Sequence, residues 1–419
     1  MARPRPSLHG LRPYLHAVVL GTAIALFSLA FLAAMVWLQT LLFRTLPERL
    51  DVREPLWILA VCVTGGLLVG VLNRSIERGR DTAHDVDEAI ADSHAAAEGA
   101  DQSPRVFFGR VGLGVVSLGF GGALGPEAPL IAYVSVLGAR VGRVLRITRD
   151  DSIQLSVAAA LGGLFATPLA ASASLDLDGE GAVARGRLQR LAPSIVAALA
   201  GLLVVRHLIP ESAFHPFEAS PGDVPAGIGT GLLAAGVVSI AAALLIRVTI
   251  ELIAPARALV VGRVSGGPIA HGLLGGIALG IVGAITPLEL FSGHHETQQL
   301  IDEAGSRGSG SLLALALVKV LLLVVLLACG YFGGQIFPMG FAGGALALAI
   351  GQMLGFDSTI TLVAAGFVAG SAVGVRRPVF TLLLMILFFP SGVWPAMALA
   401  TGAAALVLAW WPAPPPQHH

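Results

Sequence analysis

The chain has 419 residues, of which 55% are apolar and only 12% are charged, and its mean hydropathy is +0.81. An ordinary soluble domain carries roughly 25% charged residues, so this composition excludes one and predicts membrane-spanning helices. Basic and acidic residues balance at 26 each, which argues against nucleic acid as a partner. Glycine recurs inside the apolar runs, and this favours closely packed helices over a β-barrel.

Long apolar runs mark the expected spans. In chain order they cover residues 14 to 43, 55 to 72, 107 to 139, 190 to 209, 224 to 254, 256 to 286, 311 to 354 and 358 to 411. At roughly 20 apolar residues per crossing, several of these runs must hold broken helices. The polar, carboxylate-rich stretch from 81 to 101 is expected to be an exposed connector. We expect one membrane domain over 1–411, with halves at about 14–209 and 224–411, and a short cytoplasmic tail over 412–419.

Three arginine-rich segments set the expected orientation. The bias of positive charge toward the cytoplasm places all three on the inner side of a cell inner (plasma) membrane. The first apolar run is longer than a signal-peptide core, so we expect it to be retained as a helix. Cys62 and Cys329 lie in separate apolar runs and are expected to be buried thiols rather than a disulfide. The three segments contain Arg3, Arg5 and Arg12; Arg140, Arg143, Arg146 and Arg149; and Arg185, Arg187 and Arg190.

An internal repeat of glycine and proline breaks divides the chain. The stretch Gly125–Pro129 interrupts one apolar run, and Pro168 follows 39 residues after its last proline. The stretch Gly333–Pro338 interrupts another, and Pro378 follows 40 residues after it. Such breaks at matching positions predict an all-α membrane protein built as an inverted repeat, with broken helices meeting at the midplane.

A helix that starts inside the membrane can attract an anion. Its first N–H groups are unpaired and its end carries about half a positive charge, so an anion binds without the full charge of an arginine. Glu127, inside the first break, would compete for the same N–H groups and could therefore act as a protonatable gate. The alternative interpretation is a glutamate that caps the helix or pairs with a buried arginine, and the repeat favours the gate over it.

Two motifs resemble those of a known family. Gly122–Pro129, with the sequence GALGPEAP, resembles the G-[KR]-E-G-P motif of the CLC chloride channels and proton-coupled exchangers, and Gly333–Pro338 (GGQIFP) resembles their G-G-x-F-x-P motif. Shorter likenesses lie at Ala166–Ala170, Phe341–Leu346 and Arg377–Pro378. The resemblance implies a homodimer in the lipid bilayer, each subunit moving a small inorganic anion through its own pathway without cofactor or metal. Chloride is the leading substrate and fluoride or nitrate the alternatives; channel and proton-coupled exchanger both stay open, with protons as a second substrate in the latter.

The resemblance also implies a set of site residues. Glu127 takes the place of the family's gate, and main-chain N–H groups at Gln335, Ile336 and Phe337 would contact the anion. Asp178, ten residues after Pro168, takes the place of the inner proton-transfer carboxylate, although an exposed loop explains it equally well. The full anion-binding set implied is Gly125, Pro126, Ala128, Gly333, Gly334, Gln335, Ile336, Phe337 and Pro338.

Two features of the family pattern are missing from the sequence. The G-S-G-x-P motif, whose serine contacts the central anion, corresponds to Gly79–Asp85, which contains no serine or proline; Thr82 is the nearest hydroxyl. The family's inner tyrosine has no counterpart at the end of the chain, and the only tyrosines are Tyr14, Tyr133 and Tyr331.

Other residues leave alternatives open. The run His294-His295-Glu296 invites a metal site but lacks the H-E-x-x-H spacing, and a solvated loop is the other interpretation. Arg376 and Arg377 could line an anion vestibule or anchor a helix end. A membrane-embedded enzyme is the second function class, but the sequence holds no G-x-S-x-G, no H-E-x-x-H and no aspartate pair in an apolar run. A structural or signalling protein of the same fold would differ by moving no anion.

Overall fold

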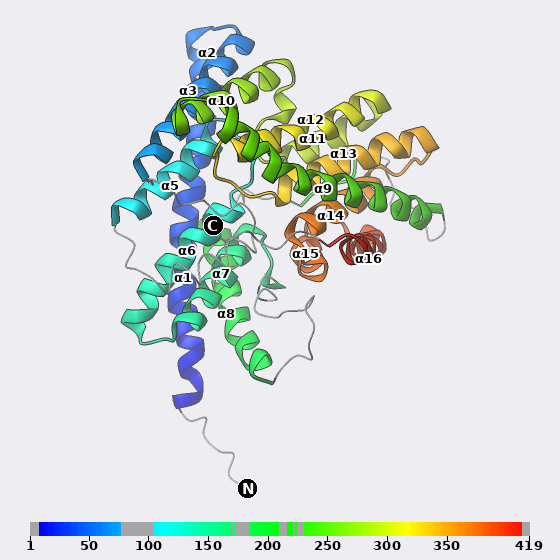
Figure 1. Ribbon diagram of the computed structural model, residues 1–419. Helices are drawn as coiled ribbons and strands as arrows, with labels where there is room; N and C mark the ends of the chain where they lie inside the picture. Colours follow the sequence, from blue (N-terminus) through cyan, green and yellow to red (C-terminus); the bar gives the residue numbers. More distant parts are fainter. Residues whose placement is uncertain are drawn as a thin grey trace. The chain divides into compact units, whose positions relative to one another are not determined.

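The computed structural model is helical through the residues that it describes, which are 8–76, 104–169, 171, 185–208, 216–220, 223 and 230–412 (Figure 1). Nine helical segments in that part are long and apolar enough to cross a bilayer, so the protein is a multi-pass membrane protein. The helices are α1 (Leu8–Thr40), α2 (Leu46–Leu50), α3 (Glu54–Ile76), α5 (Pro104–Gly119), α6 (Glu127–Leu145), α7 (Arg149–Leu164), α8 (Arg185–Leu208), α9 (Thr230–Arg263), α10 (Gly267–Ile285), α11 (His294–Glu303), α12 (Ser309–Ala328), α13 (Ile336–Leu354), α14 (Thr359–Val375), α15 (Pro378–Met385) and α16 (Trp394–Trp410).

The chain forms two compact units, and each is built from segments that are separated in the sequence. The first unit takes Met1–Ala30, Ile90–Asp101 and Leu130–His215, and the second takes the remainder: Phe31–Ala89, Gln102–Pro129 and Pro216–His419. The chain passes from one unit to the other within α1 and again near the start of α6. Both predicted helix breaks lie in the second unit.

Small residues set the helix contacts of the first unit. Helices α7 and α8 pack along their length. A β-carbon at Gly162 would overlap the backbone of Ala198, and one at Gly201 would overlap that of Ala159. In lipid there is no hydrophobic driving force between helices, so van der Waals contact at close backbone distance holds them together. This requirement explains the glycine content of the apolar runs.

Glycines also set the contacts of the second unit, which is built around α13 (Figure 1). Gly66 on α3 faces Gly272 and Gly276 on α10 so closely that a β-carbon on any of them would overlap the opposite backbone. Gly343 on α13 and Gly366 on α14 meet in the same way. Helices α9, α12 and α14 each contact α13, and α16 packs against α9 and α14.

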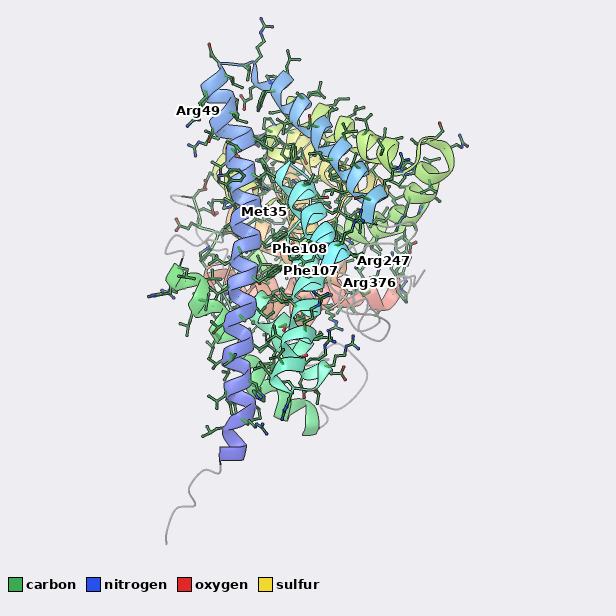
Figure 2. The ribbon with its side chains drawn as sticks, turned by 90° about the vertical axis from the view of Figure 1, so that its left-hand side faces the viewer. Met35, Arg49, Phe107, Phe108, Arg247 and Arg376 are labelled. Carbon is green, nitrogen blue, oxygen red and sulfur yellow. The ribbon has the colours of Figure 1, made fainter. Side chains whose placement is uncertain are left out.

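Figure 2 shows how one long helix and its neighbour present their side chains. Met35 lies toward the C-terminal end of α1 and Arg49 near the end of α2. On α5, Phe107 is buried whereas its neighbour Phe108 is 67% exposed, with the two rings in edge-to-face contact at 5.4 Å between centroids. An apolar side chain with that exposure is expected on a face that meets lipid.

Most predicted spans have their helices where the runs indicated, with one boundary wrong. The runs 107 to 139 and 311 to 354 are each interrupted at the predicted break, giving α5 and α6 in the first and α12 and α13 in the second. The expected boundary at Pro255 is absent, because α9 continues through that proline to Arg263. A proline removes one helical hydrogen bond but does not end a helix that neighbouring helices hold.

A buried arginine anchors the end of the described chain. Arg247 on α9, labelled in Figure 2, has a side chain that is fully buried. Its guanidinium donates to the carbonyls of Trp411 at 2.8 Å and Pro412 at 2.7 Å, pairs with Glu251 and stacks over the Trp411 ring. The charge therefore serves to hold the segment after α16 against α9.

Candidate functional site

The two helix breaks have the same backbone structure. In each, a helix ends and the chain turns through a left-handed glycine, Gly121 at φ +90° and Gly330 at φ +83°. The next residue bonds back to the carbonyl five positions earlier, which together with the left-handed glycine is a Schellman end. These bonds run from Gly122 to Ser117 and from Tyr331 to Leu326, each at 3.1 Å.

The breaks are bonded directly to each other. The N–H of Gly125 donates to the carbonyl of Gly334 at 2.8 Å, and the N–H of Gly334 donates to the carbonyl of Gly125 at 2.6 Å. This reciprocal pair is an isolated antiparallel bridge. Because backbone groups in the membrane interior must be paired, the bridge satisfies four polar groups that the breaks would otherwise leave exposed to hydrocarbon.

Glu127 is folded between the two breaks. It begins α6 and is fully buried, and its Oε1 accepts the N–H of Ile336, the first residue of α13, at 2.7 Å. The N–H groups of Phe337 and of Glu127 itself also interact with the carboxylate. A β-carbon at Gly125 or at Gly334 would overlap the glutamate side chain. We call Gly125, Glu127, Gly334, Ile336 and Phe337 the cradle.

Two serine hydroxyls hold the second break in place, and sequence analysis missed both. Ser117 on α5 accepts the N–H of Phe332 at 3.1 Å, and Ser371 on α14 donates to the carbonyl of Ile336 at 2.9 Å. Both side chains are fully buried. A buried hydroxyl with a backbone partner positions that backbone, but a single serine in an apolar helix carries no motif that would have marked it.

Two side-chain amides hold the turns that precede the breaks. Gln39 on α1 donates to the carbonyl of Leu118 at 3.0 Å, and Asn73 on α3 donates to the carbonyl of Gly330 at 2.7 Å. The Leu118 carbonyl also accepts the N–H of Gly121 at 3.2 Å, so Gln39 adds a second bond to it. Each turn is thus supported by an amide from a different helix.

Four of the predicted anion-binding residues contact Glu127: Gly125, Gly334, Ile336 and Phe337. Gln335 is the N-cap of α13 and is 6% exposed. The two breaks are buried along their whole length. Their role in anion binding stays a prediction. The remaining members of the set, all buried, are Pro126, Ala128, Gly333 and Pro338.

Several other predicted residues lie away from the cradle or outside the described chain. Asp178 and Thr82 fall outside the described residues. Tyr331 is fully buried at the second break, and its hydroxyl has no hydrogen-bond partner in the described part of the chain. Arg376 ends α14 in a left-handed conformation and Arg377 caps α15, so both belong to the connection between these helices.

The histidine run is not a solvated loop, as one interpretation of the sequence had it. His294 begins α11 and is buried against the rings of Phe217, Phe337 and Phe388, while His295 is exposed. In the described part of the chain, no group of three or more His, Cys, Asp or Glu residues could hold a metal ion. The two cysteines are buried and not bonded to each other.

A short segment beside the cradle also escaped sequence analysis. Residues 289–293, here called the strap, connect a short turn after α10 to α11. Within the strap, the N–H of Phe291 donates to the carbonyl of Gly121 at 3.0 Å, and Gly293 lies against Phe337 and Phe341, where a β-carbon would come within 3.3 Å of the Phe337 carbonyl. The strap therefore contacts both breaks.

A buried lysine fastens the strap. Lys319 on α12 is fully buried and donates to the carbonyls of Glu289 at 2.9 Å, Leu290 at 3.3 Å and Phe291 at 3.1 Å. Phe291 itself has φ +61°, a conformation that a non-glycine residue rarely adopts without support. A lone lysine inside an apolar run was the available signal, since intramembrane charges are seldom neutral to function.

Comparison with known proteins shows relatives in sequence and in fold. The chain is 29% identical over 341 residues to the protein named "Putative ion-transport protein YfeO" of Escherichia fergusonii, covering 80% of this chain and 78% of the relative. It is 30% identical over 345 residues to the protein of the same name in Escherichia coli O9:H4, with the same coverage.

Solved structures share the fold at lower identity. A slow cyanobacterial Cl⁻/H⁺ antiporter has a TM-score of 0.77 at 19% identity, covering 97% of this chain and 96% of that one. A CLC-type fluoride/proton antiporter has a TM-score of 0.73 at 16% identity, covering 96% and 97%. These likenesses confirm the predicted fold class. The profile of the family described as voltage gated chloride channel matches residues 65–409, most of the chain, and the protein therefore belongs to this family, the CLC family.

Proposed function

We propose that the protein moves chloride across a cell inner membrane, with Glu127 as a protonatable gate in a pathway through each subunit of a homodimer. The family is one of ion channels and transporters rather than enzymes. Chloride is the substrate of one fold relative, the cyanobacterial antiporter, and fluoride of another. Positive charge concentrated in the three arginine segments supports the inner-membrane assignment.

One observation carries the proposal. The Glu127 carboxylate, an anion, accepts the N–H of Ile336 at 2.7 Å in a fully buried cradle whose walls are the glycines of both breaks. A site that binds a carboxylate through helix N-terminal N–H groups has the charge and donors to bind a small inorganic anion in its place. Protonation of Glu127 removes its charge and weakens its hold on these donors.

Measured anion flux from proteoliposomes, comparing the native chain with Glu127→Gln, tests the proposal. In the native protein we expect chloride flux to rise on acidification. In Glu127→Gln we expect the part of this pH dependence that comes from titration of Glu127 to be lost. Glu303→Gln is the matched control, because Glu303 lies on the exposed side of α11 in an ion pair with Arg307. Fluoride replaces chloride in a parallel series.

The outcomes separate the remaining alternatives. Chloride flux that drives protons uphill, with coupling lost in Glu127→Gln, identifies a proton-coupled exchanger, and flux without proton movement identifies a channel. Fluoride flux without chloride flux would mean that the substrate is fluoride, and the proposed role of Glu127 as the gate would stand. If neither anion moves, the transport proposal is wrong.

A further inference from the structure

A group of charges lies beside the strap, outside the cradle. It consists of Lys319 on α12, Glu289 at the start of the strap, and Glu296 and His295 on α11. Lys319 and Glu289 are fully buried, Glu296 is half-buried and His295 is exposed. Both carboxylates interact electrostatically with Lys319, and Glu296 also interacts with His295. On α13, the group that faces Lys319 is the ring of Phe341, 4.9 Å from the nitrogen.

The contacts of Lys319 suit a cation. Its nitrogen donates to three separate carbonyls of the strap. A neutral amine has only two N–H groups, whereas an ammonium has three and no acceptor. The Phe341 ring adds a cation–π contact of the kind that favours a charged group.

The two carboxylates near this single cation differ in their hydrogen bonds. Glu296 Oε2 accepts the N–H of Gly293 at 2.9 Å from the first turn of α11, where a helix favours negative charge. Neither carboxylate oxygen of Glu289 has a hydrogen-bond partner among the residues that the structure describes. Burial raises the pKa of Glu289 to about 7, and only the attraction of Lys319 opposes it. Burial raises the pKa of Glu296 too, but there two backbone N–H groups and His295 oppose it besides Lys319, so Glu289 is the carboxylate with fewer groups to stabilise its charge.

A row of ionisable groups connects Glu289 to the surface. The exposed His295 interacts with Glu296, Glu296 interacts with Lys319, and Lys319 interacts with Glu289. The charge of the buried carboxyl is therefore coupled electrostatically, through Lys319 and Glu296, to an exposed side chain.

We propose that Glu289 is a proton-binding site, separate from the gate, whose occupancy is transmitted to the cradle through Lys319 and the strap. With Glu289 neutral, Lys319 and Glu296 balance each other and the ammonium stays on its three carbonyls. When Glu289 loses its proton, its carboxylate draws the ammonium toward itself and away from the carbonyls of Leu290 and Phe291, and so loosens the strap that contacts both breaks. The added charge also repels an anion from the cradle. Anion flux therefore falls as pH rises, independently of Glu127.

The predicted effect of Glu289 on anion flux rests on the proposed anion transport, whereas proton binding by Glu289 does not. The test therefore measures proton binding and anion flux separately. Infrared difference spectra of the purified full-length protein, titrated through neutral pH, detect the carbonyl stretch of protonated carboxyls directly. We expect a carboxyl band in Glu127→Gln that disappears in Glu127→Gln/Glu289→Gln. Adding Glu303→Gln to Glu127→Gln is the matched control and should leave the band unchanged.

The flux measurement uses the same variants in proteoliposomes. The Glu127→Gln background removes the gate's own titration, so the pH dependence that remains should be lost in Glu127→Gln/Glu289→Gln, with flux at alkaline pH equal to flux at acidic pH. An unchanged carboxyl band in the double variant overturns the proton site. A lost band with unchanged pH dependence of flux overturns the transmission to the cradle, and absence of flux in every variant points to failure of the proposed function instead.

Measuring whether each variant folds separates a loss of function from a failure to fold. A glutamine has nearly the shape of a protonated glutamate, so Glu289→Gln should fold and elute as the native protein does. If Glu289→Gln unfolds and Glu289→Gln/Lys319→Met folds again, Glu289 is needed as a charged partner of the lysine. That result would also overturn the proposal.

Discussion

The two helix breaks share one backbone design but carry different chemistry. Each residue of the first break has its counterpart 209 positions later, and Glu127 corresponds in this way to Ile336. The glutamate of the first break accepts the N–H of its own counterpart in the second. One break therefore supplies the charge and the other supplies the donor.

This difference shows how a repeated structure becomes a site. Two identical breaks would present two sets of donors and no acceptor, which suits a permanently bound anion. A carboxylate in one break alone fills the donors of the other until something displaces it, which suits a gate. The backbone can stay symmetric because only one side chain needs to differ.

The largest effect we expect concerns the strap that contacts both breaks. Because the pKa of Glu289 is raised from 4.5 to about 7, the folded protein binds this proton more tightly than the unfolded chain does. The stabilisation is complete below pH 4.5 and is lost as pH rises to about 7, amounting to about 3 kcal/mol. Thermal unfolding in detergent should show this loss in Glu127→Gln, where the buried gate carboxyl no longer titrates, but not in Glu127→Gln/Glu289→Gln. Equal pH dependence in both would contradict it.

A smaller effect is expected from filling the space between the breaks. In Gly334→Ala the new methyl group would overlap the Glu127 side chain, so the carboxylate cannot fold back onto Ile336. We expect a loss of about 1–3 kcal/mol in the free energy of unfolding and flux that no longer responds to pH through Glu127. Gly402→Ala on α16 is the matched control, since a β-carbon there meets nothing within 4 Å. Native gating in Gly334→Ala would show that the carboxylate does not use this space.

The smallest effect distinguishes the two serines that support the second break. Ser117→Ala removes the acceptor of the Phe332 N–H, and a buried donor without a partner costs about 1–3 kcal/mol. Ser371→Ala removes a donor from the Ile336 carbonyl, which as a helical carbonyl has further bonding capacity, so we expect about 1 kcal/mol or less. Thermal unfolding of the two variants should rank them in this order, and the reverse ranking would mean that the Ile336 carbonyl depends on Ser371 alone.

The sequence predicted the helix breaks well because glycine and proline act locally. Gly125–Pro129 and Gly333–Pro338 interrupt helices as expected. Glycine widens the range of backbone conformations at its own position, and proline fixes φ and removes an N–H donor at its own. Pro255 shows the limit of this reasoning, because contacts between α9 and its neighbours hold the helix together through the proline. Local signals predict where a helix can break, whereas packing decides whether it does.

The support of the cradle could not be predicted, because it depends on residues distant in sequence. Ser117 bonds a residue 215 positions away, and Lys319 bonds a segment about 28 to 30 positions before it. No spacing rule connects such pairs. The same holds for His294, whose place in an aromatic cluster depends on helices brought together only by folding.

The paired bonds between Gly125 and Gly334 have a consequence for the speed of the protein. The two breaks cannot separate without losing both bonds, so the part free to move at the cradle is a side chain rather than a helix. Collective motions of helices or domains take roughly microseconds to milliseconds, and single side chains rotate orders of magnitude faster. With Glu127 as the gate that we propose, a turnover would therefore be timed by the arrival of protons and anions, and a slow transport rate would reflect how seldom they meet at the cradle.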